Sequence, residues 1–94
     1  MIRHIVCWKL KDENKEENIA RMKRELTALV GKIDGLVSLE VGACFENGAW
    51  DAALDSVFES REALEGYRVH PEHVKVADFI HTIMVERTAV DYEI

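Results

Sequence analysis

The stretch IRHIVCWKL, residues 2–10, alternates side chains with a period of two, which is typical of a β-strand. One face of this predicted strand also carries Ile5 and Cys7, which are as apolar as their neighbours on the opposite face. A strand with one face in water would be polar on that side, so we expect protein to cover both faces. The strand therefore predicts a sheet that needs a covering layer on each side.

An amphipathic helix is expected next. Asn14 is a candidate N-cap with Glu17 three positions later, and the helix is expected to end at Asp34 and Gly35. Apolar residues recur along it at helical spacing, which predicts a stripe packed on a sheet. The stripe consists of Ile19, Met22, Leu26, Leu29, Val30 and Ile33.

Two further strands, LVSLEVGACF (36–45) and WDAALDSVFE (50–59), follow this helix. They are joined through Asn47 and Gly48, a pair that favours a type I′ turn and hence an antiparallel hairpin. Gly42 predicts a bulge or a close approach of another backbone, because glycine contributes no side-chain packing to a strand.

A second helical region is interrupted by the only proline of the chain, Pro71. Ser60 is a candidate N-cap, His70 should be extended because it precedes proline, and Pro71 suits the first position of a new helix. A last strand is expected from about residue 82 to residue 92.

The resulting order, βαββαβ, predicts one α+β domain over residues 1–94 with a ferredoxin-like fold: a four-stranded antiparallel sheet with the helices on one face. The other face would stay bare in a single copy. We expect a second copy to cover it in a two-fold homodimer, which forms an α+β barrel between subunits.

Composition narrows the classes of partner. The chain has 94 residues, a formal net charge of −6 and a pI near 5.1, which argues against nucleic-acid binding. It shows neither a signal-peptide pattern nor an apolar run long enough to span a membrane, so we expect a cytoplasmic protein without a membrane partner. Cys7 and Cys44 form no CxxC framework and are expected to be free thiols packed as small apolar side chains.

The segment YRVHPEH, residues 67–73, concentrates groups able to do chemistry. His73 could act as a base and Tyr67 could donate a hydrogen bond to an oxygen that becomes negative. His73 lies in the first turn after Pro71, where the positive helix end should keep its ring neutral. Whether the two side chains converge does not follow from their spacing, since the proline breaks the helical phase.

Each of these residues also has a purely structural interpretation. Tyr67 can be a packed ring, His4 a core histidine on an apolar strand face, and His70 a bridge across the helix break, while His81 is expected to face solvent. His70 and His73 lie three residues apart, but the proline prevents a regular helical ligand pair, and no metal site is predicted.

Several segments resemble the stress-responsive A/B barrel (Dabb) domain family, and the resemblance covers essentially the whole chain. They are IRHIVCWKLKD (2–12), VFESREALEGYRVHPEHVKVADFI (57–80) and AVDY (89–92), the most specific element being Tyr-x-x-His-Pro-x-His. The resemblance implies a ferredoxin-like dimeric α+β barrel. Most members of this family have no assigned reaction.

The family includes olivetolic acid cyclase, to which this chain is distantly similar and which closes a polyketide by aldol condensation without metal or cofactor. Its catalytic pair corresponds to Tyr67 and His73, and two residues of its pocket correspond to His4 and Asp91. The resemblance thus implies catalytic roles for Tyr67 and His73, substrate-binding roles for His4 and Asp91, and no cofactor.

The sequence departs from that enzyme at the pocket. Its first helix offers Ile19 and Met22 in place of aromatic residues, and Arg87 stands where the relative is apolar, so a long hydrophobic polyketide is not expected as the ligand. Arg87 and Asp91 lie four apart on a strand and share a face. Either they form an ion pair, or Arg87 holds an anionic ligand.

Trp8 is interpreted as a core or interface anchor that also belongs to the candidate substrate-binding set. Two functions remain open. The first is a pocket for a small oxygenated or anionic molecule with cofactor-free, cyclase- or isomerase-like acid/base chemistry. The second is a non-catalytic stress-response or ligand-binding protein, with the space near His73 filled by Phe58, Phe79 and Trp8. A haem- or quinone-handling monooxygenase is a third possibility, based on fold similarity alone.

Overall fold

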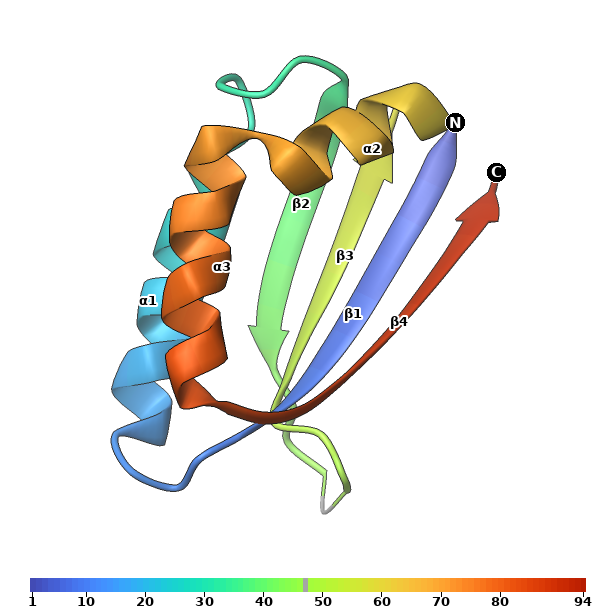
Figure 1. The fold of residues 1–94 in the computed structure, drawn as a ribbon. Helices are drawn as coiled ribbons and strands as arrows, with labels where there is room; N and C mark the ends of the chain where they lie inside the picture. The colour runs from blue at the N-terminus through green and yellow to red at the C-terminus, as the bar shows by residue number, and fades with distance from the viewer. Residues whose placement is uncertain (47) are drawn as a thin grey trace.

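The computed structural model describes residues 1–46 and 48–94. Its four strands form one sheet in the order β2-β3-β1-β4, and all neighbouring strands are antiparallel. Figure 1 shows the three helices on a single face of this sheet. The elements are β1 (Ile2–Leu10), α1 (Lys15–Thr27), β2 (Leu36–Ala43), β3 (Ala52–Phe58), α2 (Arg61–Val69), α3 (Pro71–Ile83) and β4 (Met84–Glu93). The predicted ferredoxin-like α+β fold is confirmed.

Strand β1 lies in the interior of the sheet between β3 and β4. Its helix-facing residues are all buried, and all but one of them, a histidine, are apolar. These residues are Ile2, His4, Val6, Trp8 and Leu10. The core therefore lies between this face of the sheet and the helices, as the alternation in residues 2–10 predicts.

Helix α1 is shorter than predicted, since it ends at Thr27 and not at Asp34. The chain tightens into three-residue turns, with the Leu29 N–H bonded to the Leu26 carbonyl, and Gly31 then adopts a φ of +92° that no α-helix can contain. Leu29 is still buried from these turns, whereas Val30 is 40% exposed and does not join the apolar stripe.

The start of α1 also differs from the prediction. Asn14 occupies the N-cap position, but its φ of 54° is left-handed and its side chain makes no capping bond. Its carbonyl instead accepts the Asn18 N–H at 2.9 Å. The expected capping box with Glu17 is therefore not formed.

Strands β2 and β3 form the predicted antiparallel pair. Beyond the end of both strands, the Cys44 N–H donates to the Asp51 carbonyl at 2.9 Å. The predicted type I′ turn includes Asn47, which lies outside the described residues. The prediction of a bulge at Gly42 is wrong. The register shifts between Leu36 and Ser38, and a Cβ on Gly42 would meet no atom within 4 Å.

The break at Pro71 has the predicted form. Ser60 caps α2 by accepting the Ala63 N–H at 3.1 Å, and His70 is extended with φ −65° and ψ 132°. The His70 ring then accepts the Glu72 N–H at 3.1 Å through Nδ1, so it caps α3 across the break. The histidine before the proline is thus a structural residue.

The second face of the sheet is covered by no element that the structure describes (Figure 1). Ile5 and Cys7 are half-buried by their neighbours in the sheet, while Val90, paired with Ile5 across β1 and β4, is 55% exposed. Cys44 is exposed, so only Cys7 of the two free thiols packs as expected. None of the described helices has the length and apolar character needed to cross a bilayer.

Candidate functional site

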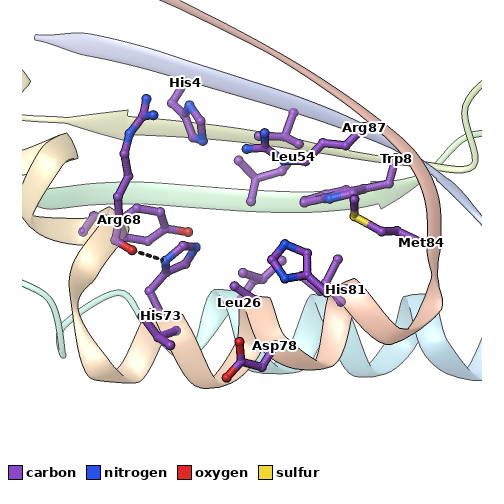
Figure 2. A pocket seen from close by; sticks show the side chains of 15 residues that line it. His4, Trp8, Leu26, Leu54, Arg68, His73, Asp78, His81, Met84 and Arg87 are labelled. Atoms are coloured by element: carbon purple, nitrogen blue, oxygen red, sulfur yellow. Dashed lines mark hydrogen bonds between the residues drawn. The ribbon is translucent and has the colours of Figure 1, made fainter.

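A cavity of about 340 Å³ lies between the helix-facing side of the sheet and α3. Figure 2 shows His4 entering it from the sheet and His73 from α3. Five of the six candidate residues line this cavity: His4, Trp8, Tyr67, His73 and Arg87. The sixth, Asp91, lies behind His4 and borders a neighbouring hollow.

The structure brings Tyr67 and His73 together. Their ring centroids are 4.1 Å apart with the planes inclined by 33°, although they belong to different helices. The tyrosine ring also meets Phe58 edge-on at 4.9 Å, which fixes it against the sheet. The extended residue before Pro71 turns the chain, so that α3 starts in a new direction at the end of α2 (Figure 1) and the two rings meet across the break.

The tautomer of His73 follows from its hydrogen bond. Nδ1 lies 3.3 Å from the Arg68 carbonyl, as drawn in Figure 2. Because a carbonyl can only accept, Nδ1 carries the proton, and in the neutral ring Nε2 keeps a free lone pair. The ring is half-buried, and this burial lowers the pKa of His73 below its ordinary 6.5, with further lowering from the charges of Arg87 and Arg68.

The sequence predicts a neutral His73 ring at physiological pH, and in the structure burial of the ring is the largest cause of its lowered pKa. A neutral imidazole with one lone pair free is the form able to accept a proton. The geometry therefore gives His73 the protonation state of a base.

Tyr67 is 3% exposed, and burial raises the pKa of its hydroxyl to about 12, against an opposing influence of Arg87. The hydroxyl therefore keeps its proton throughout the physiological range. Among the described residues it has no hydrogen-bond partner, and the residue lines the cavity. A protonated, unpaired donor beside a free imidazole nitrogen is suited to hold an oxygen atom of a bound molecule.

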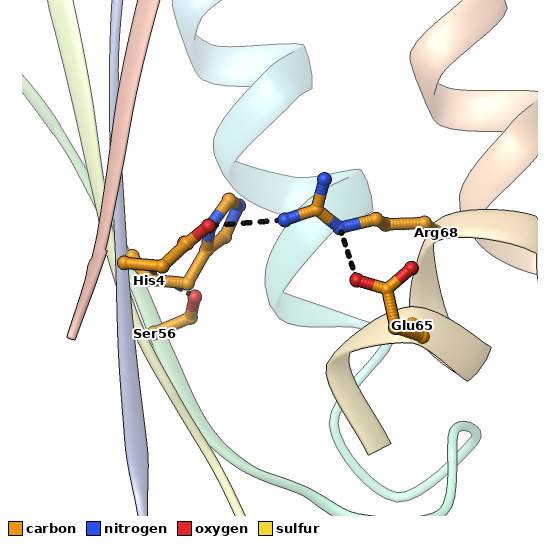
Figure 3. A network of polar contacts seen from close by, with 5 residues as sticks. His4, Ser56, Glu65 and Arg68 are labelled. Atoms are coloured by element: carbon orange, nitrogen blue, oxygen red, sulfur yellow. Dashed lines mark hydrogen bonds and ion pairs between the residues drawn. The ribbon is translucent and has the colours of Figure 1, made fainter. Parts of the chain in front are cut away.

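His4 is held by a chain of polar contacts (Figure 3). Its Nδ1 donates to Asp91 Oδ1, and Asp91 Oδ2 accepts from Arg68 Nη2 at 3.0 Å. Arg68 Nε also lies 3.7 Å from Glu65, and the buried Ser56 hydroxyl donates to the His4 carbonyl at 2.9 Å. Asp91 therefore orients this ring, with Nδ1 toward its carboxylate and Nε2 on the other side of the ring.

The alternative ion pair between Arg87 and Asp91 is not formed. Residues four apart on a strand share a face but are separated by roughly 13 Å at 3.3 Å per residue. Asp91 instead bonds His4 and Arg68. Arg87 makes no ion pair with any residue in the described part of the chain, and Figure 2 shows its side chain reaching from β4 toward the cavity.

Two residues of the site escaped the sequence reasoning. Arg68 supplies both the carbonyl that fixes His73 and the guanidinium that binds Asp91, contacts that no local pattern predicts. His81 is exposed as expected, but it also lines the cavity. Its spacing of eight from His73 on one helix, slightly more than two turns, could have indicated this shared face.

Within residues 1–46 and 48–94, no three His, Cys, Asp or Glu side chains are grouped so that they could hold a metal ion. The polar side chains that line the cavity are mostly basic, with the Tyr67 hydroxyl and one acidic residue, Asp78, beside them.

Comparison with known proteins gives a family match over nearly the whole chain. The family model for the Stress responsive A/B Barrel Domain matches residues 2–94. The chain is 31% identical to a stress-response A/B barrel domain-containing protein of Arabidopsis thaliana over 96 aligned residues, covering 98% of this chain. It spans 36% of the length of that relative.

Solved structures show the same fold. A dimeric protein of unknown function with a ferredoxin-like fold from Bacteroides fragilis is 33% identical, with a TM-score of 0.91 over 99% of this chain and 95% of that chain. A hydroxynitrile lyase from Passiflora edulis is 16% identical, with a TM-score of 0.86 over 99% of this chain and 92% of that chain. At that identity the likeness concerns the fold alone.

Proposed function

This chain belongs to the Stress responsive A/B Barrel Domain family, and from this premise we propose that it binds a small oxygenated molecule in the cavity and moves a proton on it without a cofactor. The observation that carries the proposal is the contact of Tyr67 with His73 at the cavity wall. His73 is the base and Tyr67 the hydrogen-bond donor.

The reaction class is proton abstraction beside a carbonyl group. His73 Nε2 takes a proton from the carbon next to the carbonyl, and the electron pair of that C–H bond becomes the C=C bond of an enolate. The carbonyl oxygen gains the negative charge and accepts a hydrogen bond from the Tyr67 hydroxyl. Return of the proton to carbon gives back the ketone or an isomer, and attack of the enolate carbon on a second carbonyl would close a ring.

The electrostatics of the pair support these roles. The lowered pKa of His73 leaves a neutral acceptor at physiological pH, and the raised pKa of Tyr67 keeps its donor protonated. Burial is the main cause of both shifts, because it disfavours the charged form of each group, and it thereby leaves a base and a donor within one site. Trp8, Leu26 and Leu54 form an apolar part of the cavity wall, and the low local dielectric there would strengthen each interaction with the enolate oxygen.

We also propose that the protein is a homodimer in which a second copy covers the open face of the sheet. The 33% identical relative of the same fold is dimeric. In this chain the open face has an apolar centre that includes Ile5 and Val90, beside an ion pair of Arg3 Nε and Asp55 at 3.6 Å. A second copy packed on this face would remove the apolar centre from water, which favours association.

Proton exchange in heavy water tests the chemistry without knowledge of the natural substrate. The protein is incubated with acetone, butanone, cyclohexanone, pyruvate and levulinate, and proton NMR follows the loss of the signals next to each carbonyl. The wild type should accelerate exchange of at least one of these compounds, and His73→Gln should abolish the acceleration. Lys75→Gln, on the same helix with its side chain 73% exposed, should leave it unchanged.

Equal exchange rates for wild type and His73→Gln would refute the catalytic proposal. If the compounds bind in the cavity without exchange, the non-catalytic ligand-binding alternative is the correct one. The cavity beside His73 supports the catalytic proposal over a closed core. Phe79, one of the residues that could have filled this space, packs instead on Arg21, whose Cζ lies 3.7 Å from the Phe79 ring centroid.

A further inference from the structure

The cavity is lined by an excess of basic side chains. They are His4, Arg68, His73, His81 and Arg87. The single acidic residue among the lining residues, Asp78, is exposed, and Figure 2 shows its carboxylate directed away from the sheet and the cavity. This basic lining contrasts with the net charge of −6 of the whole chain.

Only one of the two arginines has a positive charge available for a ligand. Arg68 is neutralised by Asp91 at 3.0 Å and by Glu65 at 3.7 Å. Arg87 has no acidic partner among the described residues and sits opposite Trp8 in the register of β1 and β4. Trp8 faces the helices, so the register places Arg87 on the cavity side of the edge strand.

The charge of Arg87 acts inside the cavity. It opposes protonation of His73 and favours ionisation of Tyr67, so its field reaches both residues of the pair. Arg87 is exposed, so salt screens its charge over about 8–10 Å at physiological ionic strength, and its attraction is strongest for an anion bound directly beside it. An anion in the cavity would therefore respond to Arg87 more than to the acidic surface.

We propose that the ligand is a small oxo acid whose carboxylate is bound by the Arg87 guanidinium while its carbonyl oxygen accepts the Tyr67 hydroxyl. The proposal rests on the proposed function for the second contact and names its substrate class. Arg87 is the residue that sets specificity: it holds the carboxylate end and presents the carbon beside the carbonyl to His73 Nε2.

A carboxylate fits this site better than a phosphate. One guanidinium offers a planar fork of two N–H donors, which matches the two oxygens of a carboxylate and its single charge. A volume of about 340 Å³ is near the lower end of the roughly 300–1,000 Å³ of typical ligand cavities, which suits a compact acid.

Paired acids and amides test the proposal. Isothermal titration calorimetry measures the Kd of pyruvate, acetoacetate and levulinate, and of the amide of each acid, which keeps the carbonyl but lacks the charge. Wild type should bind at least one acid about tenfold or more tightly than its amide, and Arg87→Gln should remove this preference without changing the affinity for the amide. Arg87→Lys should restore part of it.

Arg61→Gln is the matched control. It removes one positive charge as Arg87→Gln does, but Arg61 bonds Glu93 at 2.8 Å and lies outside this cavity. The preference for the acid should survive in this variant. The proposal is overturned if none of the acids binds, if acid and amide bind alike, or if the two arginine variants behave alike.

The exchange assay separates this proposal from the proposed function. Binding of an acid through Arg87 without exchange contradicts the catalytic roles of Tyr67 and His73 and leaves the anion site intact. If the wild type exchanges neutral ketones, and Arg87→Gln changes neither this exchange nor the binding of the acids, the anion site is contradicted and the catalytic pair is left intact.

Discussion

The rings of Tyr67 and His73 lie 4.1 Å apart, centroid to centroid, on opposite sides of the break at Pro71. The helix break thus does more than turn the chain. It places a buried hydroxyl and a half-buried imidazole at the wall of one cavity, with the Arg68 carbonyl fixing which nitrogen of His73 stays free.

The rate of exchange should depend on the protonation of His73. Burial lowers its pKa below 6.5, helped by the positive charges of Arg87 and Arg68, and the neutral ring is the active form. The rate should therefore stay constant as the pH falls through 6.5 and decline only at the lower pKa of the folded protein. A pH–rate profile with the main inflection above 6.5 would assign the base to another group.

The orientation of His4 should depend on Asp91. A carboxylate can only accept, so it fixes the proton of neutral His4 on Nδ1, whereas the amide of Asp91→Asn can also donate and should allow both tautomers. Nitrogen NMR of the imidazole reports this change. Glu65→Gln removes the other acidic neighbour of Arg68 without touching His4, and it should leave the tautomer unchanged. A wild-type His4 protonated on Nε2 would contradict the assignment.

The packing of α2 should be sensitive to Gly35. A Cβ at this position would lie 2.5 Å from the Cβ of Ala63 on α2, and the φ of +85° disfavours any other residue. Gly31, with a φ of +92° and open space around its Cβ position, is the matched control for backbone strain alone. Gly35→Ala should lose at least about 1 kcal/mol more free energy of unfolding than Gly31→Ala. Urea unfolding measures this difference, and equal losses would mean that α2 tolerates the displacement.

The dimer should depend on the open face of the sheet. Val90→Glu places a charge at the apolar centre of this face and should convert the homodimer to a folded monomer in sedimentation experiments, with the circular dichroism spectrum preserved. Val69→Glu, at the end of α2 and 75% exposed, should remain dimeric. A wild type that sediments as a monomer at micromolar concentration would refute the proposed assembly.

The fold could be predicted from the sequence because its signals are local. The alternation in residues 2–10 and the proline after an extended His70 each depend on neighbouring residues alone. The predictions failed where a local pattern had several solutions. At the start of α1, the Asn18 N–H is bonded by the carbonyl of Asn14 and not by its side chain. At the other end, the helix stops before Gly31, whose φ is positive, although Leu29 stays buried.

The site could be predicted only in part, because shared faces do not fix distances. Residue spacing correctly places Arg87 and Asp91 on one face of β4, but the rise of the strand separates them, and Asp91 is bound by Arg68, 23 positions away in the sequence. The role of Arg68 depends on how two helix ends meet the edge strand. No periodicity in the sequence carries that information.

The central claim, that Tyr67 and His73 act as one proton-transferring unit, is tested most directly by a double-mutant cycle on the exchange rate. Wild type, Tyr67→Phe, His73→Gln and the double variant are compared on the compound that wild type exchanges fastest, after circular dichroism has shown that each is folded. Each single change is expected to lower the rate by on the order of 10²-fold or more, and the second change is expected to add little. Independent, multiplicative losses, or a double variant as fast as wild type, would contradict the claim.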